Sequence, residues 1–142
     1  MRRWALAMVS AAGLLAPGAE VMAQETSFSL QLIGNEAKDG QCTVVFLASN
    51  KLGVDITDAR FELYIIDVTG AFKGAFNLKL PSIVSGKQKA MKFTLPPACD
   101  QIDRLLSNGF TVCQGQKDEM DQCNKGLRMS SKIKIIFSDD AP

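Results

Sequence analysis

The sequence predicts an all-β fold, an immunoglobulin-like antiparallel β-sandwich of about seven strands with one short connecting helix and two disulfides. Short runs of alternating apolar and polar residues recur along the chain, and turn-forming residues separate them. The chain has four cysteines and no histidine in 142 residues. Alternation with frequent turns indicates half-buried strands, and an even cysteine count indicates disulfides.

The first 23 residues have the features of a cleaved export signal. Arg2 and Arg3 form a positive start, an alanine-rich apolar stretch follows, and small residues precede the expected cleavage site after Ala23. We therefore expect residues 24–142 to form a single domain. The sequence leaves open whether the Sec or the twin-arginine route exports the chain.

The apolar stretch of the signal is too short for the roughly 20 residues of a spanning helix. It is also interrupted by Gly13 and Pro17. We expect no stable membrane insertion after cleavage and a periplasmic location.

Charge excludes one class of partner. The chain carries 16 basic and 15 acidic side chains. Because Arg2, Arg3 and Glu20 fall within the signal, the two signs balance in the mature chain. Nucleic-acid binding needs a concentrated basic face, so we expect no nucleic-acid partner.

The cysteines predict structural disulfides. A thioredoxin-like site requires two cysteines separated by two residues, a zinc site usually includes histidine, and a nucleophilic cysteine needs a base. The sequence offers none of these. If the strand that begins at Cys42 pairs antiparallel with the strand that ends before Cys99, Cys42–Cys99 with Cys113–Cys123 is favoured. Cys99–Cys113 with Cys42–Cys123 remains the alternative.

The expected strands are defined by alternation and by the turns that end them. Pro81 and the pair Pro96-Pro97 end two of them because proline cannot donate to a sheet. The expected strands cover 27–32, 42–48, 61–67, 75–80, 89–95, 110–113 and 131–137. The one expected helix covers 100–107, where Ile102, Leu105 and Leu106 are spaced as on one helical face.

Two groups of charged residues are candidate sites. The loop 117–122 is acidic but lacks the alternating oxygen ligands and central glycine of an EF-hand, so solvated side chains are the better interpretation. Asp100, Asp103 and Arg104 fit the start and the surface of a helix better than a carboxylate pair. We therefore predict no catalytic residue, no metal site and no cofactor.

Four apolar residues are candidates for binding a partner. Val45 and Leu47 on one expected strand, and Tyr64 and Ile66 on another, cannot face the same core as their neighbours. Either the sandwich covers them or they meet a partner. The loop 114–126, long and polar between two cysteines, is a second candidate for recognition.

Two segments carry a family resemblance: LPPACDQIDRLLSNGFTVC (95–113) and CNKGLRMSSKIKIIF (123–137). The chain resembles a family of small exported proteobacterial proteins that are largely uncharacterised. The resemblance rests on the placement of the cysteines, on the Leu-Pro before the expected helix and on the Gly-Leu before the last strand. The resemblance implies a four-cysteine envelope domain that works beside a Tol- or TonB-type complex. It implies no catalytic residue.

The leading hypothesis is a non-catalytic periplasmic module that binds another envelope protein. The alternatives are a carrier that holds a lipid or another small ligand between the sheets, and a small histidine-free enzyme that uses a carboxylate or the thiol of Cys113 or Cys123. The sequence does not identify the partner or the oligomeric state.

Overall fold

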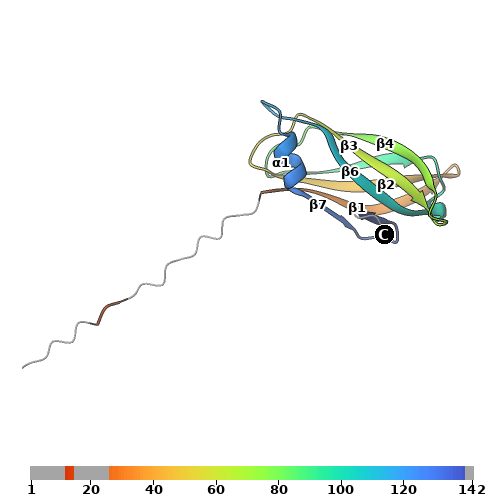
Figure 1. The fold of residues 1–142 in the computed structure, drawn as a ribbon, viewed down its shortest axis with the longest axis horizontal. Helices are drawn as coiled ribbons and strands as arrows, with labels where there is room; N and C mark the ends of the chain where they lie inside the picture. Colours follow the sequence, from red (N-terminus) through yellow and green to blue (C-terminus); the bar gives the residue numbers. More distant parts are fainter. Residues whose placement is uncertain (1–11, 15–25, 140–142) are drawn as a thin grey trace, which may run out of the picture.

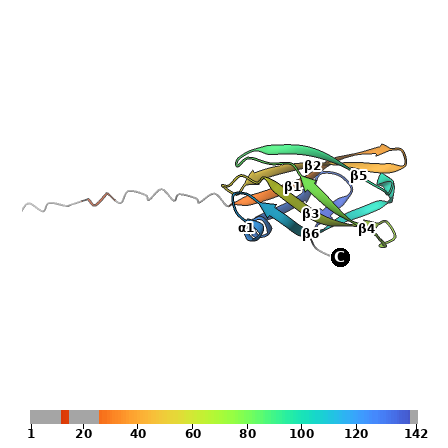
Figure 2. The same ribbon diagram turned by 90° about the horizontal axis from the view of Figure 1, so that it is seen from above.

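The computed structural model describes residues 12–14 and 26–139, and from residue 27 onward the chain folds as two packed four-stranded sheets (Figures 1 and 2). One sheet has the strand order β5-β2-β1-β7 and the other β4-β3-β6-β8. The strands are β1 (Ser27–Lys38), β2 (Gln41–Lys51), β3 (Asp58–Asp67), β4 (Phe72–Leu80), β5 (Gln88–Leu95), β6 (Ile102–Gln114), β7 (Leu127–Ser131) and β8 (Ile136–Ser138). A 3₁₀ turn (Cys99–Gln101) precedes β6, and the helix α1 (Met120–Lys125) lies between β6 and β7.

The strand neighbours confirm the immunoglobulin-like sandwich. β2 pairs antiparallel with β5 in one sheet, and β3 pairs antiparallel with β6 in the other. These are the B–E and C–F neighbours of an immunoglobulin-like domain. The sandwich has eight strands, and it is not wholly antiparallel, because β7 runs parallel to β1 and β8 runs parallel to β6.

The disulfides form with the pairing that the strand order favours. Cys42 lies opposite Leu95 in the β2–β5 ladder, which brings the start of β2 to the end of β5 and to Cys99. The Cys42–Cys99 bond joins residues 57 positions apart, and the Cys113–Cys123 bond joins residues 10 positions apart. The second bond ties the end of β6 to α1, so the predicted staple of the loop 114–126 is confirmed.

Phenylalanine rings connect the two sheets through the core. Phe28 of β1 lies edge to face with Phe110 of β6, at 5.2 Å between ring centroids, and Phe110 contacts Phe61 of β3 at 5.3 Å. Phe61 continues to Phe137 at 6.0 Å, and Phe137 reaches Phe46 of β2 at 5.1 Å. Each of these five rings is at most 4% exposed. Aromatic burial of this extent supplies much of the core energy of a domain this size.

The predicted helix over 100–107 is wrong. Apart from the 3₁₀ turn, this segment belongs to β6, which pairs with β3 over its whole length. The β3–β6 ladder is irregular between two neighbouring pairs, Ile66 with Arg104 and Asp67 with Ile102. β6 has one extra residue at this point, and it places Ile102 and Leu105 on the same inner face. A bulge therefore gave the strand an apolar spacing that resembles a helix.

The single last strand predicted over 131–137 is also wrong. β7 ends at Ser131 in one sheet, the chain bends, and β8 begins at Ile136 in the other sheet. The Ser131 hydroxyl donates to the carbonyl oxygen of Ile135 at 2.6 Å and stabilises the bend. The predicted inward direction holds, because Ile135 and Phe137 are buried and Ile133 packs on the core.

The predicted signal, residues 1–23, lies outside the described residues except for 12–14. In the described part of the chain, no helix combines the length and the apolar character that a membrane crossing requires.

Candidate functional site

The four predicted partner-binding residues lie on two opposite outer faces of the sandwich. Val45 and Leu47 alternate with the buried Val44 and Phe46 of β2, so they face outward from the sheet β5-β2-β1-β7. Tyr64 and Ile66 alternate with buried residues of β3 and face outward from the other sheet. All four side chains are half-buried. One partner surface cannot include both pairs.

The residues beside Val45 and Leu47 in the sheet are polar or small. Val45 lies between Gly34 and Lys92 in the ladder, and Leu47 lies between Gln31 and Ala90. Gln31 donates to the Ser130 hydroxyl at 3.2 Å, and Lys92 pairs with Glu36 at 3.3 Å. Val45 and Leu47 therefore form an adjacent pair of half-buried apolar side chains with polar side chains at their border.

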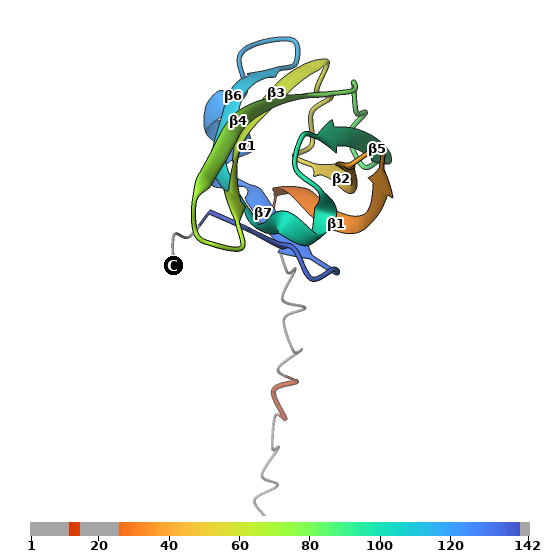
Figure 3. The same ribbon diagram turned by 90° about the vertical axis from the view of Figure 1, so that its right-hand side faces the viewer.

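Tyr64 and Ile66 belong to a larger apolar surface. The β-ladders place Phe72 of β4 directly beside Ile66, and Leu106 of β6 directly beside Tyr64. Ile136 of β8 completes the surface beside Arg104. Phe72 is 60% exposed and Ile136 is 43% exposed. We call Tyr64, Ile66, Phe72, Leu106 and Ile136 the outer apolar face; Figure 3 shows three of its strands, β4, β3 and β6, side by side.

Arg104 interrupts this surface without separating its parts. It lies between Ile66 and Ile136 in the ladder, its side chain is only 18% exposed, and its Nε donates to the Asp103 carboxylate at 3.0 Å. A half-buried arginine covers its apolar neighbours with its alkyl stem and keeps its charged end at the edge. Asp103 and Arg104 therefore form a pair on a strand, and the helical placement expected for them is wrong.

Glu62 and Asn108 border the outer apolar face on one side. The Asn108 amide donates to the Glu62 carboxylate at 2.6 Å and to the Tyr64 hydroxyl at 3.4 Å. The hydrogen bond between the Tyr64 hydroxyl and Glu62, followed by the negative charge of Glu62, raises the pKa of Tyr64.

The turn after β3 positions Phe72. Asp67, which is 7% exposed, accepts hydrogen bonds at one carboxylate oxygen from the Thr69 hydroxyl at 2.6 Å and from the backbone N–H groups of Thr69 and Ala71 at 2.9 Å each. The bond from the Thr69 hydroxyl, followed by that from the Ala71 N–H, lowers the pKa of Asp67 to about 2. The turn is thus held by a charged acceptor, and Ala71, the last residue bonded to it, directly precedes the strand that carries Phe72.

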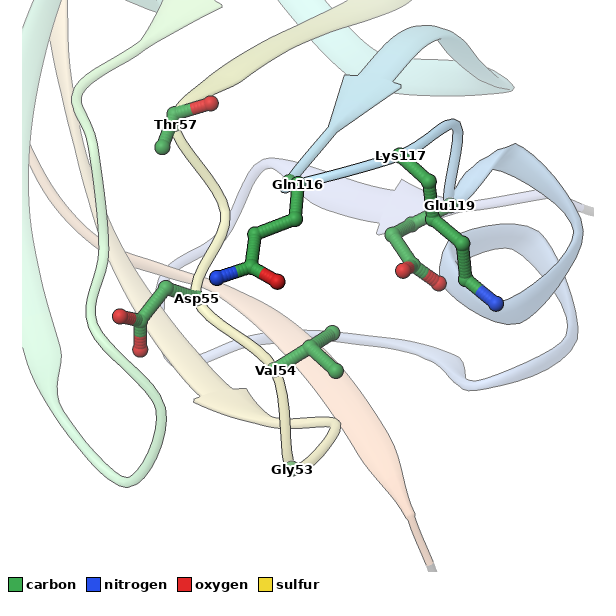
Figure 4. Close-up of a pocket in the computed structure, with 8 residues that line it drawn as sticks. Gly53, Val54, Asp55, Thr57, Gln116, Lys117 and Glu119 are labelled. Atoms are coloured by element: carbon green, nitrogen blue, oxygen red, sulfur yellow. The ribbon is translucent and has the colours of Figure 1, made fainter.

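A pocket of about 770 Å³ opens at the end of the sandwich that carries α1 (Figures 1 and 4). One wall is the loop 53–57 between β2 and β3, and the other is the segment 115–119 after β6. The buried Asn50 amide fixes the first wall by donating to the carbonyl oxygens of Val54 at 2.8 Å and Ile83 at 2.9 Å. The Thr57 N–H donates to the Gln114 carbonyl oxygen at 2.7 Å and joins the two walls.

The pocket corrects the interpretation of the acidic loop 117–122. Asp118 and Asp121 are solvated as predicted, but Glu119 is 4% exposed and lines the pocket. Residues 12–14 and 26–139 contain no group of three or more acidic or cysteine side chains arranged to hold a metal ion.

Sequence reasoning missed four of the residues described above: Phe72, Leu106, Ile136 and Glu119. Phe72 comes one residue after the turn Asp67–Gly70 and is followed by Lys73, which is a usable signal for an exposed apolar residue at a strand start. The expected helix over 100–107 includes Leu106, and Ile136 falls on the outward face of the expected strand over 131–137. Glu119 lines a pocket together with the loop 53–57, which lies far from it in the sequence, so the local sequence does not encode this position.

Comparison of the chain with protein-family models, with curated proteins and with solved structures finds no match. The assignment of function therefore depends on the chain's own surfaces.

Proposed function

We propose that this protein is a non-catalytic periplasmic module that binds another envelope protein through the outer apolar face. The observation that carries the proposal is the exposure of Phe72 and Ile136 on a surface that Tyr64, Ile66 and Leu106 make continuous. Contiguous apolar surface bordered by polar residues is typical of protein interaction sites.

The framework of this face supports protein binding. Its residues stand on four neighbouring strands of one sheet, which hold the side chains in fixed positions before a partner arrives. Glu62, Asn108 and the Asp103–Arg104 pair provide polar groups at its border. A central apolar anchor with a polar border is the usual composition of an interface.

The cysteines and the core argue against the rival functions. All four cysteines are in disulfides, so the enzyme hypothesis has no free thiol for a nucleophile. The space between the sheets is occupied by a continuous cluster of buried side chains, which disfavours a lipid carrier of the predicted kind.

Disulfides are also typical of an oxidising compartment such as the periplasm. The family resemblance names a Tol- or TonB-type complex as the partner to test first.

The test is site-specific photo-cross-linking in cells with a photoreactive amino acid at position 72, followed by mass spectrometry of the product. Position 84 is the matched control, because Val84 is an exposed apolar residue, 52% exposed, in the loop between β4 and β5. We expect one dominant envelope protein to be captured from position 72 and not from position 84. The variant Ile66→Asp should abolish the capture, while Val84→Asp should leave it unchanged.

Capture of the same proteins from both positions, or none from position 72, would contradict the proposal. If Ile66→Asp prevents folding, Phe72→Asp replaces it, since Phe72 is the most exposed member of the face. The disulfides and the circular dichroism of each variant show whether it has folded.

A further inference from the structure

Arg104 lies in a row of side chains that crosses the outer apolar face. The register of three ladders aligns one residue from each strand of this sheet, in the order Phe72, Ile66, Arg104 and Ile136. With about 4.8 Å between neighbouring strands, the row is about 14 Å long. Its two ends are the exposed apolar residues Phe72 and Ile136. A partner that covers both ends therefore covers the stem of Arg104 and meets its charged end.

Most donors of the Arg104 guanidinium have no acceptor among the described residues. Its Nε donates to the Asp103 carboxylate at 3.0 Å, and no residue of the described part of the chain accepts from Nη1 or Nη2. The buried side-chain polar atom that lacks a hydrogen bond in residues 12–14 and 26–139 is Oδ1 of Asp58, so both Nη atoms of Arg104 reach solvent. These two nitrogens carry four of the five N–H donors of a guanidinium.

Asp103 holds Arg104 in place without occupying Nη1 and Nη2. Asp103 has no partner residue in the β3–β6 ladder, which pairs its two neighbours, Ile102 and Arg104. Its hydrogen bond to Arg104 runs from Nε to Oδ2 and leaves the fork formed by the two Nη groups open. Because the pair has no net charge, the open hydrogen-bond donors decide which group binds here.

A partner must supply an oxygen acceptor where it covers Arg104. A wholly apolar partner would remove solvent from the guanidinium and leave charged donors unsatisfied, which is costly. A carboxylate fits best, because its two oxygens match two parallel N–H groups and charge-assisted hydrogen bonds are stronger than neutral ones. The apolar side chains of Ile66 and Ile136 on either side keep water away and strengthen such a bond.

We propose that the outer apolar face binds a protein segment that carries an Asp or Glu side chain between two apolar side chains, with the carboxylate on the fork of Arg104. This inference rests on the proposed function and names the chemistry of its partner. Alternate residues of an extended chain face one side and lie about 6.6 Å apart. An extended segment in the order apolar-x-acid-x-apolar therefore spans about 13 Å, close to the distance from Phe72 to Ile136.

The test is a selection from a random peptide library displayed on phage, with the oxidised parent protein and Arg104→Met immobilised in parallel. We expect the parent protein to enrich peptides with Asp or Glu between two apolar residues, and Arg104→Met to enrich peptides without the acidic residue. The most enriched peptide is then synthesised with its acid, with the corresponding amide and with leucine at that position. By isothermal titration calorimetry, the parent protein should bind the acidic form at least about tenfold more tightly than the leucine form, with the amide form between them.

The matched control variant is Arg60→Met. Arg60 is exposed on the same side of β3, six residues or about 20 Å from Ile66, so its loss should leave the binding of all three peptides unchanged. Arg104→Met should bind the acidic and leucine forms equally. Enrichment of no peptide, or equal binding of the acidic form and either other form by the parent protein, would overturn the inference. The peptide comparison uses the parent protein, so it decides even if Arg104→Met fails to fold.

Photo-cross-linking from position 72 in cells separates this inference from the proposed function. We expect the capture to fall at least about tenfold in Arg104→Met and to stay unchanged in Arg60→Met. Capture that is lost in Ile66→Asp but unchanged in Arg104→Met would overturn the inference and leave the proposed function in place. Absence of capture in the parent protein would contradict the proposed function itself.

Discussion

Tyr64 and Phe72 lie edge to face on the outside of the molecule, with 5.5 Å between ring centroids and an angle of 88° between the ring planes. The register places Phe72 opposite Ile66, so its ring reaches diagonally over the β3–β4 ladder to Tyr64. Such a pair contributes about 0.5–1.5 kcal/mol beyond the area it buries. The contact orients a ring that otherwise projects into solvent.

Phe72→Ala should therefore cost little stability. We expect the free energy of unfolding to fall by no more than about 1.5 kcal/mol, measured in urea, because Phe72 is 60% exposed. Phe61→Ala serves as the buried comparison and should cost about 3–5 kcal/mol, because Phe61 is 0% exposed at the centre of the core. Equal losses in the two variants would mean that Phe72 belongs to the core and not to a binding surface.

The stability of the domain should depend on pH through Asp67. Hydrogen bonds from Thr69 and Ala71 lower its pKa in the folded state from the ordinary 3.8 to about 2. Folding thus favours the ionised form, and this contribution to stability is present above pH 4 and disappears as the pH falls from about 4 to 2. Asp67→Asn should unfold at lower urea concentration than the parent protein at pH 6.

At pH 2 the urea midpoints of the two proteins should approach each other, since the parent protein has then lost the same charge. Asp139→Asn, in an exposed position after β8, is the control and should show no such pH-dependent difference. If the urea midpoints of the parent protein and Asp67→Asn differ by the same amount at pH 6 and at pH 2, the charge of Asp67 does not stabilise the turn.

The two disulfides should contribute unequally to stability. Cys42–Cys99 closes a segment of 57 residues and Cys113–Cys123 a segment of 10. The chain-entropy relation then gives about 4 kcal/mol for the first bond and about 3 kcal/mol for the second. Thermal unfolding of the double variants Cys42→Ala/Cys99→Ala and Cys113→Ala/Cys123→Ala measures the difference. If Cys113→Ala/Cys123→Ala loses more stability than Cys42→Ala/Cys99→Ala, the loop 114–126 and α1 stabilise the sandwich by more than the chain-entropy relation predicts for this bond.

Gly115→Ala should disturb the pocket. A Cβ atom at this position would lie 2.6 Å from the Asp55 carbonyl oxygen, a distance at which the backbone must move. We expect the loops 53–57 and 115–119 to separate, with a loss of stability of about 1–3 kcal/mol. Gly86→Ala, in the loop between β4 and β5, is the comparison: a Cβ there meets no atom within 4 Å, so only the strain of its φ of +79° is tested. If Gly115→Ala is as stable as the parent, the two walls are not held as closely as described.

Much of the fold could be predicted because alternation and disulfide spacing are local or nearly local signals. The alternation of Phe28, Leu30 and Leu32 in β1 matches their burial, and the pairing of Cys42 with Cys99 follows from two strands that the sequence marks clearly. The error in β6 has a physical cause. Its ladder with β3 is irregular at three points, and each irregularity changes the spacing of inward residues.

The candidate site was less predictable for a related reason. Tyr64 and Ile66 could be identified as residues facing away from the core, because they alternate with buried neighbours. Their continuity with Leu106 and Ile136 depends on which strands lie beside β3, and that order is set by long-range pairing. Whether the outer apolar face meets a partner remains a prediction, as does the role of Val45 and Leu47.

The bend between β7 and β8 carries the end of the described chain to the edge of the outer apolar face, since Ser138 lies opposite Leu106. The start of β1 lies at the opposite end, where the Phe28 N–H donates to the carbonyl oxygen of Gly126 beside α1. An affinity tag fused behind β8 would therefore emerge beside the surface whose partner is sought and would compete with that partner. A tag inserted in the hairpin between β1 and β2, at Asp39-Gly40, is attached to exposed residues of the other sheet.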